Sequence, residues 1–273
     1  MIRLTLRVPS TIPLELDGIT PDRIANLSAI DVGKLPVFHG NRREPLGEFF
    51  QVEPGNRGKA DIVFAGDTRN VKSIGAGMRS GFVFVENAAG MHAGAKMSGG
   101  SLVIDSGAGD WLGAEMTGGE IEVRGSSGHL VGAAYRGSRR GMSGGTILIR
   151  GNAGDEVGLL MRRGLIAVEG NLDAFAGASM IAGTIVVGGH VGERLGAGMK
   201  RGTLLISGSK PNLPPSFAFS CEYRPAFLGL LLRHLRKLEE SLAQRFDVPT
   251  IRYYRGDRLT GGNGEVLVAP GSI

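Results

Sequence analysis

The sequence predicts a mainly β protein in the form of a β-solenoid, whose coils each contain about 19 residues. Seven methionines recur 19 residues apart, with a single interval of 26, and a glycine follows each one three residues later. Each repeat also contains a short strand of alternating apolar residues, which buries its apolar face only by stacking on its neighbours. The methionines are Met78, Met97, Met116, Met142, Met161, Met180 and Met199.

Residues 1–58, which precede the repeats, are expected to form a small α/β lead-in. The first residues, MIRLTLRV, alternate between apolar and polar side chains, which favours a β-strand. Thr20, Pro21 and Asp22 have the composition of a helix start, with Thr20 as the N-cap. We therefore expect a short helix over residues 21–27.

Residues 59–209 contain the repeats, and their apolar residues form rows at a fixed period. The glycines between the rows are expected at corners, because glycine adopts positive φ and lets neighbouring coils approach closely. The first coil, from Ile62 to Met78, is two residues longer than the next, as terminal repeats often are. The strand rows are Val83 and Val85, Leu102 and Ile104, Ile121 and Val123, Ile147 and Ile149, Ile166 and Val168, Ile185 and Val187, and Leu204 and Ile206; the row before the glycine is Ile74, Ala93, Leu112, Val131, Val157, Ala176 and Leu195.

The string IGAGMRSG at residues 74–81 raises the alternative of a phosphate-binding loop. A dinucleotide fingerprint needs G-x-G-x-x-G between a strand and a helix, whereas this string has G-x-G-x-x-x-G and no helical run after it. The nearly identical LGAGMKRG returns at residues 195–202. The repetition favours corner glycines over a binding loop.

Basic residues gather directly after two of the methionines and in an insertion. The long methionine interval places seven extra residues between Gly132 and Met142, in the segment AAYRGSRRG. The two pairs that follow methionines lie two coils apart, which corresponds to about 10 Å between stacked strands. We expect a basic corner that either binds an anion, faces solvent or pairs with a partner. Its residues are Arg136, Arg139, Arg140, Arg162, Arg163, Lys200 and Arg201.

Residues 210–273 are expected to form a C-terminal extension. From Pro225 to Phe246, leucines and phenylalanines recur at spacings of three and four residues, which predicts one amphipathic helix of about 22 residues. A solenoid must hide its open edges. We expect the apolar face of this helix to cover an end or a side of the solenoid, or to dock a sister subunit.

The residues argue against several function classes. A repeat of 19 is not a multiple of six, as a hexapeptide acyltransferase would require, and no aspartate recurs in the frame of a calcium-binding repeat. His92, His129 and His190 fall at different places in the repeat, and Cys221 has no histidine at motif spacing. No G-x-S-x-G or Walker loop occurs, so we expect no metal site and no catalysis by this chain alone. A polysaccharide-active solenoid that works as an isolated chain stays the alternative of another class.

Charge and hydropathy suggest where the chain works. The net charge of +5 favours acidic partners, but one Trp and four Tyr give few of the aromatic residues that single-stranded nucleic-acid binders use. The longest apolar run, Ala226 to Leu232, is too short to span a bilayer, and the N-terminus has no secretory core. We expect a cytoplasmic protein with neither nucleic acid nor membrane as its partner.

The period and the G-A-x-M-x-x-G unit resemble the GXGXG family of β-helices. Two flanking blocks resemble one branch of it, the C subunit of formylmethanofuran dehydrogenase and of the related bacterial formyltransferase/hydrolase complex. LPVFHGNRREPLGEFFQVEPG (residues 35–55) is similar to its lead-in, and YYRGDRLTGGNGEVLVA (residues 253–269) to its closing β-hairpin. A glutamate synthase-type domain fits these flanks poorly. The resemblance implies a right-handed parallel β-helix, a hand that stacking alone does not decide.

The resemblance also implies a function. In those complexes the C subunit is a noncatalytic scaffold next to amidohydrolase-like and formyltransferase-like chains and a chain like the B subunit of the dehydrogenase; zinc lies on a partner, and the C subunit itself holds no cofactor. The complex moves a formyl group from tetrahydromethanopterin to a methanofuran-type coenzyme and releases formate in formaldehyde oxidation. The coenzyme's glutamate-rich tail makes the seven basic residues its candidate contacts, because arginine pairs carboxylates bidentately. The excess of arginine over lysine favours the bacterial complex. The tungsten or molybdenum dehydrogenase is the alternative.

Overall fold

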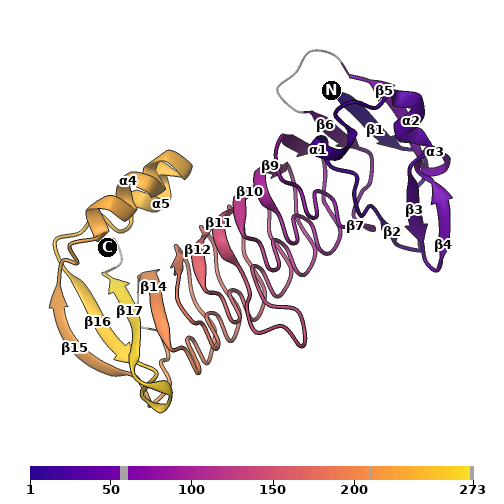
Figure 1. The fold of residues 1–273 in the computed structure, drawn as a ribbon. Coiled ribbons are helices and arrows are strands. Elements are labelled where there is room, and N and C mark those ends of the chain that lie inside the picture. Colours follow the sequence, from indigo (N-terminus) through magenta and orange to yellow (C-terminus); the bar gives the residue numbers. More distant parts are fainter. Residues whose placement is uncertain (56–60, 209–210, 271–273) are drawn as a thin grey trace.

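The computed structural model describes residues 1–55, 61–208 and 211–270, and it is mainly β, as the sequence predicts (Figure 1). The strands of the repeats lie side by side in chain order, and every neighbouring pair of them is parallel. They are β6 (Ile62–Ala65), β8 (Phe82–Val85), β9 (Ser98–Ile104), β10 (Gly118–Val123), β11 (Ser143–Ile149), β12 (Arg163–Val168), β13 (Thr184–Val187) and β14 (Arg201–Ser207).

The register of these strands follows the sequence repeat. Val83 pairs with Leu102, Leu102 with Ile121, and Ile121 with Ile147, across the insertion. A second line of parallel bridges runs beside the sheet with the same offset, through Ala89, Ala108, Ser127, Ala153, Leu172 and Val191. The chain therefore returns to equivalent places once per repeat. The described strands nevertheless form an open mixed sheet, and the closure of each repeat into a β-helix stays a prediction.

The core lies between the sheet and the turns that follow it. All seven methionine anchors are fully buried, and both apolar rows of the sequence prediction are buried with them. The corner glycines have positive φ, as expected. At Gly100 (φ +80°) a Cβ would lie 2.7 Å from the carbonyl oxygen of Gly81, so a close approach between neighbouring repeats requires glycine there.

Both ends of the sheet turn antiparallel. The terminal strands are β1 (Ile2–Leu6), β5 (Phe50–Pro54), β15 (Ala218–Tyr223), β16 (Ile251–Gly256) and β17 (Asn263–Ala269). β1 pairs parallel with β6 and antiparallel with β5, while β17 pairs parallel with β14 and antiparallel with β16. The N-terminal strand and the closing hairpin are thus confirmed, and the hairpin also adds a strand to the row. Together the described strands give this sheet 13 members.

The lead-in also contains three short helices and three short strands, which form a smaller sheet with β7 (Val71–Lys72) of the first repeat (Figure 1). The elements are β2 (Leu14–Glu15), β3 (Pro36–His39), β4 (Arg42–Pro45), β7 (Val71–Lys72), α1 (Pro21–Ile24), α2 (Ala29–Gly33) and α3 (Leu46–Phe49). The helix expected over residues 21–27 is only four residues long. Thr20 is its N-cap residue and Pro21 begins it, as expected, but the buried Thr20 hydroxyl makes no capping hydrogen bond. The predicted boundaries at 58/59 and 209/210 lie outside the described residues.

The C-terminal extension contains two helices in place of the one expected. They are α4 (Leu228–Leu238) and α5 (Glu240–Gln244), and a 3-10 turn, η1 (Arg258–Thr260), lies in the hairpin. Glu239 breaks the helix with φ −157°, because its side chain accepts a hydrogen bond from Ser241 N–H and pairs with Arg150. Along the described chain no helix is long and apolar enough to cross a membrane.

The helices cover a side of the sheet, as one of the expectations for them proposed. In β8 to β10 buried residues alternate with part-exposed ones. From β11 onward the alternation fails, because the outward residues are apolar and buried as well. They form a second core with α4, α5 and β17, which contains Leu148, Leu165, Ala167, Val186, Leu205, Leu228, Leu232, Leu235, Leu242, Ala243, Phe246, Ile251, Leu267 and Ala269. The strictly alternating strands of the sequence prediction are therefore wrong for these later repeats.

Candidate functional site

The basic residues that follow the methionines lie at equivalent places in their repeats. Arg162 N–H donates to Met142 O at 2.8 Å, and Lys200 N–H donates to Met180 O at 2.8 Å, two repeats further on. The side chains of Arg162, Arg163, Lys200 and Arg201 are all exposed. Two steps between neighbouring parallel strands span about 10 Å. The structure thus brings these four cations to one edge of the row of strands, as the sequence predicts.

The other three basic residues lie on the insertion loop, defined here as residues 133–141. Figure 1 shows it as a loop longer than its neighbours, between β10 and β11. Its base is bonded to the next repeat, where Ala134 N–H donates to Leu159 O and Gly141 N–H donates to Leu160 O. Leu160 lies two residues before Arg162 in the chain. The base of the insertion loop therefore lies close in the fold to the segment that leads into Arg162 and Arg163.

The seven cations form what we call the basic edge: Arg136, Arg139, Arg140, Arg162, Arg163, Lys200 and Arg201. Within the described structure their side chains have no ion pair and no hydrogen bond. Arg150 is the contrasting case, since its guanidinium contacts Glu122, Glu169 and Glu239. Unpaired guanidinium groups are suited to bidentate binding of carboxylates. The arrangement can therefore hold a flexible ligand that carries several carboxylates.

Arg255 extends the basic edge and was missed in the sequence. β17 lies next to β14, and Asn263 is the partner of Arg201 in that register. Arg255 is exposed and donates from its guanidinium to Asn263 Oδ1 at 3.2 Å and to Gly262 O at 2.6 Å. The sequence indicated a closing hairpin that contains Arg255. Only the structure shows that this hairpin pairs with β14, which places Arg255 next to the basic edge.

A cluster of three rings beside the insertion loop was also missed. Trp111 lies one repeat after His92, and Tyr135 of the insertion loop stacks on Trp111 with ring centroids 4.8 Å apart. The Tyr135 hydroxyl lies 2.9 Å from His92 Nδ1, and Lys96 Nζ lies 5.5 Å from the phenol ring. The sequence offered one signal, an aromatic residue in the insertion. It could not place Tyr135 next to Trp111, because the insertion interrupts the 19-residue repeat that relates Trp111 to His92.

Burial sets the protonation of this cluster. It raises the pKa of Tyr135 to about 12, with a smaller contribution from the carboxylates of Glu115 and Asp17. Burial, followed by the charge of Lys72, lowers the pKa of His92. At neutral pH the phenol therefore keeps its proton and the imidazole is uncharged, and one hydrogen bond joins the two groups. A cavity of about 460 Å³ opens beside these groups and is lined by Glu15, Asp17, Gly18, Arg23, Ser73, Ala76, Gly77, His92, Ala95, Lys96 and Tyr135.

Two other histidines, His129 and His190, take part in hydrogen bonds between repeats. Backbone N–H groups are bonded to side chains of the preceding repeat: His129 N–H to Asp110, Asp155 N–H to His129 Nδ1, and Ala174 N–H to Asp155. His190 N–H likewise donates to Asn171 Oδ1. In the described residues no three metal-binding side chains come together. Asp110, His129 and Asp155 thus form a hydrogen-bonded ladder between repeats.

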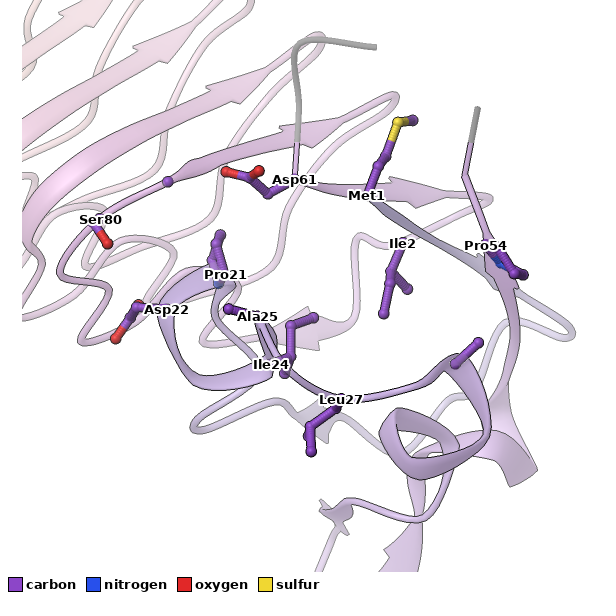
Figure 2. Close-up of a pocket in the computed structure, with 12 residues that line it drawn as sticks. Met1, Ile2, Pro21, Asp22, Ile24, Ala25, Leu27, Pro54, Asp61 and Ser80 are labelled. Carbon is purple, nitrogen blue, oxygen red and sulfur yellow. The ribbon is translucent and has the colours of Figure 1, made fainter. Parts of the chain in front are cut away.

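A cavity of about 420 Å³ lies where the lead-in meets the first repeats (Figure 2). Pro21, Asp22 and Ile24 of the α1 region line it, together with Asp61 and Ser80. Both carboxylates already accept backbone hydrogen bonds, Asp61 from Phe82 N–H at 2.8 Å and Asp22 from Arg79 N–H at 3.3 Å. These acids stabilise the contact between lead-in and repeats. None of the residues that line this cavity belongs to the basic edge.

Comparison with known proteins shows a match over nearly the whole chain. The X-ray structure of the formyltransferase/hydrolase complex from Methylorubrum extorquens, in complex with methylofuran, contains a chain that is 35% identical. The match covers 99% of this protein and 100% of that chain, with a TM-score of 0.90. The chain matches no protein-family model.

Sequence relatives point to the same kind of protein. The C subunit of molybdenum-containing formylmethanofuran dehydrogenase 1 from Methanosarcina barkeri is 45% identical over 85 residues, which is 30% of this chain and 28% of the relative. The C subunit of tungsten-containing formylmethanofuran dehydrogenase 2 from Methanothermobacter thermautotrophicus is 38% identical over 97 residues, 34% of this chain and 36% of the relative. The chain thus spans about a third or less of these relatives. Taken with the match to the complex over the full length, they show that the chain belongs to the C-subunit family shared by formylmethanofuran dehydrogenases and the formyltransferase/hydrolase complex.

Proposed function

We propose that this protein is the noncatalytic scaffold, or C subunit, of a cytoplasmic, hetero-oligomeric formyltransferase/hydrolase complex. The complex transfers a formyl group from tetrahydromethanopterin to a methanofuran-type coenzyme and releases formate. Its other chains are amidohydrolase-like, formyltransferase-like and similar to the B subunit of the dehydrogenase, and the amidohydrolase-like chain holds zinc. The observation that supports this proposal is the match to a chain of such a complex, at 35% identity and over 99% of this protein.

The proposal includes the finer fold. Each repeat closes into one coil of a right-handed parallel β-helix. The two parallel ladders, one through the sheet and one through the bridges from Ala89 to Val191, support this because they advance by the same repeat. The hand comes from the resemblance to the GXGXG family. A rod of this kind offers long sides on which several subunits assemble.

The proposal also assigns the basic edge. Its seven cations, without partners in the described structure, contact the glutamate-rich tail of the coenzyme and guide it between active sites on other subunits. Exposed charge pairs contribute up to about 1 kcal/mol each, so one pair gives little affinity and several give a useful amount. A tail with several carboxylates gains from contacts along an edge whose two pairs of cations at strand starts lie about 10 Å apart.

The assembly is tested by native mass spectrometry of a tagged copy purified from its own organism under mild conditions. Co-purification with an amidohydrolase-like and a formyltransferase-like chain, without a metal-pterin, supports the proposal. A metal-pterin partner would select the second candidate, a molybdenum or tungsten dehydrogenase, which the 45% identity to the Methanosarcina barkeri protein favours. A lone stable chain would refute both and revive the alternative of a polysaccharide-active enzyme.

The basic edge is tested by charge reversal in the assembled complex. Arg139→Glu with Arg140→Glu is expected to raise the KM for the coenzyme about 30-fold, which corresponds to about 2 kcal/mol from two reversed charges, and to leave kcat unchanged. Arg79→Glu is the matched control, because Arg79 is exposed and follows a methionine anchor but lies several repeats from the insertion loop. An intact complex with an unchanged KM removes the assignment.

A further inference from the structure

The tip of the insertion loop, residues 135–140, has a single side-chain attachment to the rest of the described structure. Tyr135 makes it, while the side chains of Arg136, Arg139 and Arg140 are exposed and free of hydrogen bonds. The Ser138 hydroxyl donates to Arg140 O at 3.3 Å, so it bonds within the tip. The direction of the tip therefore depends on Tyr135.

Tyr135 is held from several sides. Its ring stacks on Trp111 at 4.8 Å with an interplanar angle of 24°, and its hydroxyl is hydrogen-bonded to His92 Nδ1 at 2.9 Å. Its backbone N–H donates to Glu115 Oε1 at 3.3 Å, and Glu115 lies 3.8 Å from the Lys96 ammonium that faces the phenol ring. A stacked aromatic pair contributes beyond its buried area. These contacts leave the residue little freedom to rotate.

Backbone hydrogen bonds connect Tyr135 to the part of the loop that contains the arginines. Ser138 N–H donates to Tyr135 O at 2.9 Å, which closes a turn through Arg136 and Gly137, the latter with φ +86°. At the exit of the loop, Gly141 N–H donates to Leu160 O at 2.9 Å. The turn is therefore tied at its start to the ring cluster and at its end to the segment that leads into Arg162.

We propose that Tyr135 is a positioning residue, which holds the insertion loop so that its arginines meet the same carboxylate-bearing chain as Arg162 and Arg163. This inference rests on the proposed role of the basic edge and adds that the loop is ordered before the ligand arrives. Ordering long side chains during binding reduces affinity, and a preformed loop avoids part of that loss. Tyr135 itself touches no ligand in this arrangement.

The test uses the intact complex and measures KM and kcat for the coenzyme, inhibition by a short oligoglutamate peptide, and hydrogen exchange of the insertion loop. Tyr135→Ala removes the stack and the hydroxyl, whereas Tyr135→Phe keeps the stack. Phe175→Ala is the matched control, because Phe175 occupies the same left-handed turn position as Trp111 in another repeat and has Arg194 over its ring, with no insertion beside it.

We expect Tyr135→Ala to raise the KM and the inhibition constant about tenfold with kcat unchanged, and to speed exchange in the loop. Tyr135→Phe is expected to change both constants by no more than about threefold. Phe175→Ala is expected to match the wild type. If Tyr135→Ala does not assemble, Tyr135→Leu replaces it, since leucine fills the space but makes neither the ring stack nor the hydrogen bond to His92.

The outcomes separate the inference from the function on which it rests. If Arg139→Glu with Arg140→Glu raises the KM but Tyr135→Ala does not, the basic edge stands and the positioning role of Tyr135 is wrong. Loop exchange that stays at the wild-type rate in Tyr135→Ala refutes the role as well. If the double reversal leaves the KM unchanged, the basic edge itself fails, and Tyr135 then has no ligand contact to position.

Discussion

Arg150 connects the outer face of the sheet to the C-terminal helices, and its replacement by glutamine tests that connection. Its Nε donates to Glu122 Oε1 at 3.0 Å, and its Nη1 contacts Glu169 and, at the break between α4 and α5, Glu239. The Glu169 and Glu239 side chains are only 17% and 18% exposed. Arg150→Gln leaves these carboxylates close together without their cation.

The expected loss lies between two limits. Removing one partner of a fully buried ion pair costs about 3–5 kcal/mol, and an exposed pair is worth no more than about 1 kcal/mol. The Arg150 side chain is 35% exposed, so we expect a loss of about 2 kcal/mol in the free energy of unfolding. For a chain of this size that lowers the Tm by about 4–8 °C.

The assay is urea unfolding together with hydrogen exchange of α4 and α5. Arg124→Gln is the control, because Arg124 occupies the equivalent place one repeat earlier, is 50% exposed and pairs with Asp105. It is expected to cost less than about 1 kcal/mol. Faster exchange in α4 and α5 should accompany Arg150→Gln alone. Equal losses for the two variants would refute the reasoning.

The pH dependence of the loss follows from Glu169. Burial, and then the charge of Glu239, raise the pKa of Glu169 above its usual value. A carboxyl with a raised pKa holds its proton more readily in the folded state than in the unfolded state, so lowering the pH through that window relieves its cost. The deficit of Arg150→Gln is therefore expected to shrink as the pH falls from neutral toward the ordinary glutamate pKa of about 4.3. A deficit that grows on acidification contradicts this account.

Three further predictions concern packing, the corners and the ring cluster. Gly100→Ala is expected to lower the free energy of unfolding in urea by about 3 kcal/mol or more, because the new Cβ would meet a backbone oxygen. Gly77→Ala, with φ +69° and no atom within 4 Å of the new Cβ, is expected to lower it only by the left-handed strain of about 1–2 kcal/mol. Equal losses for the two variants would contradict this. Leu232→Ala, at a side chain 1% exposed, should lower the free energy of unfolding by about 2–5 kcal/mol, and a loss below about 1 kcal/mol would show that the helices are loosely docked. The lowered pKa of His92 means that its ring becomes charged only below about pH 6.5. The fluorescence of Trp111, the only tryptophan, should therefore change with a midpoint below that value as the charge forms beside it, and a higher midpoint is the contrary result.

The repeat could be predicted because its physical cause is local and periodic. A buried methionine, a glycine with positive φ and an alternating strand recur together, so each repeat supports the interpretation of the next. The helix break at Glu239 could not be predicted in this way. The apolar stripe continues across it, and the break depends on Arg150, which lies 89 residues earlier in the chain.

In the candidate site, too, the residues that follow the repeat could be predicted and the others could not. The four basic residues after methionines were placed by the repeat, and the structure puts them on one edge. The positions of Tyr135 and Arg255 could not be predicted in this way, because the insertion and the closing hairpin do not follow the 19-residue repeat. Whether the basic edge binds the coenzyme stays a prediction, since its basis is unpaired charge and a resemblance.

The apolar outer face of the later repeats has a consequence for synthesis on the ribosome. That face is finished once Leu205 has been made, but the helices that cover it end only near Phe246, 41 residues later. At roughly 5–20 residues per second this interval is about 2–8 s. During that time a row of Leu, Val and Ala side chains is uncovered on a growing chain, where it is open to self-association or to a chaperone. A chain truncated before Leu228 would leave this face uncovered permanently, so about the last sixth of the chain also governs whether the earlier repeats stay dispersed.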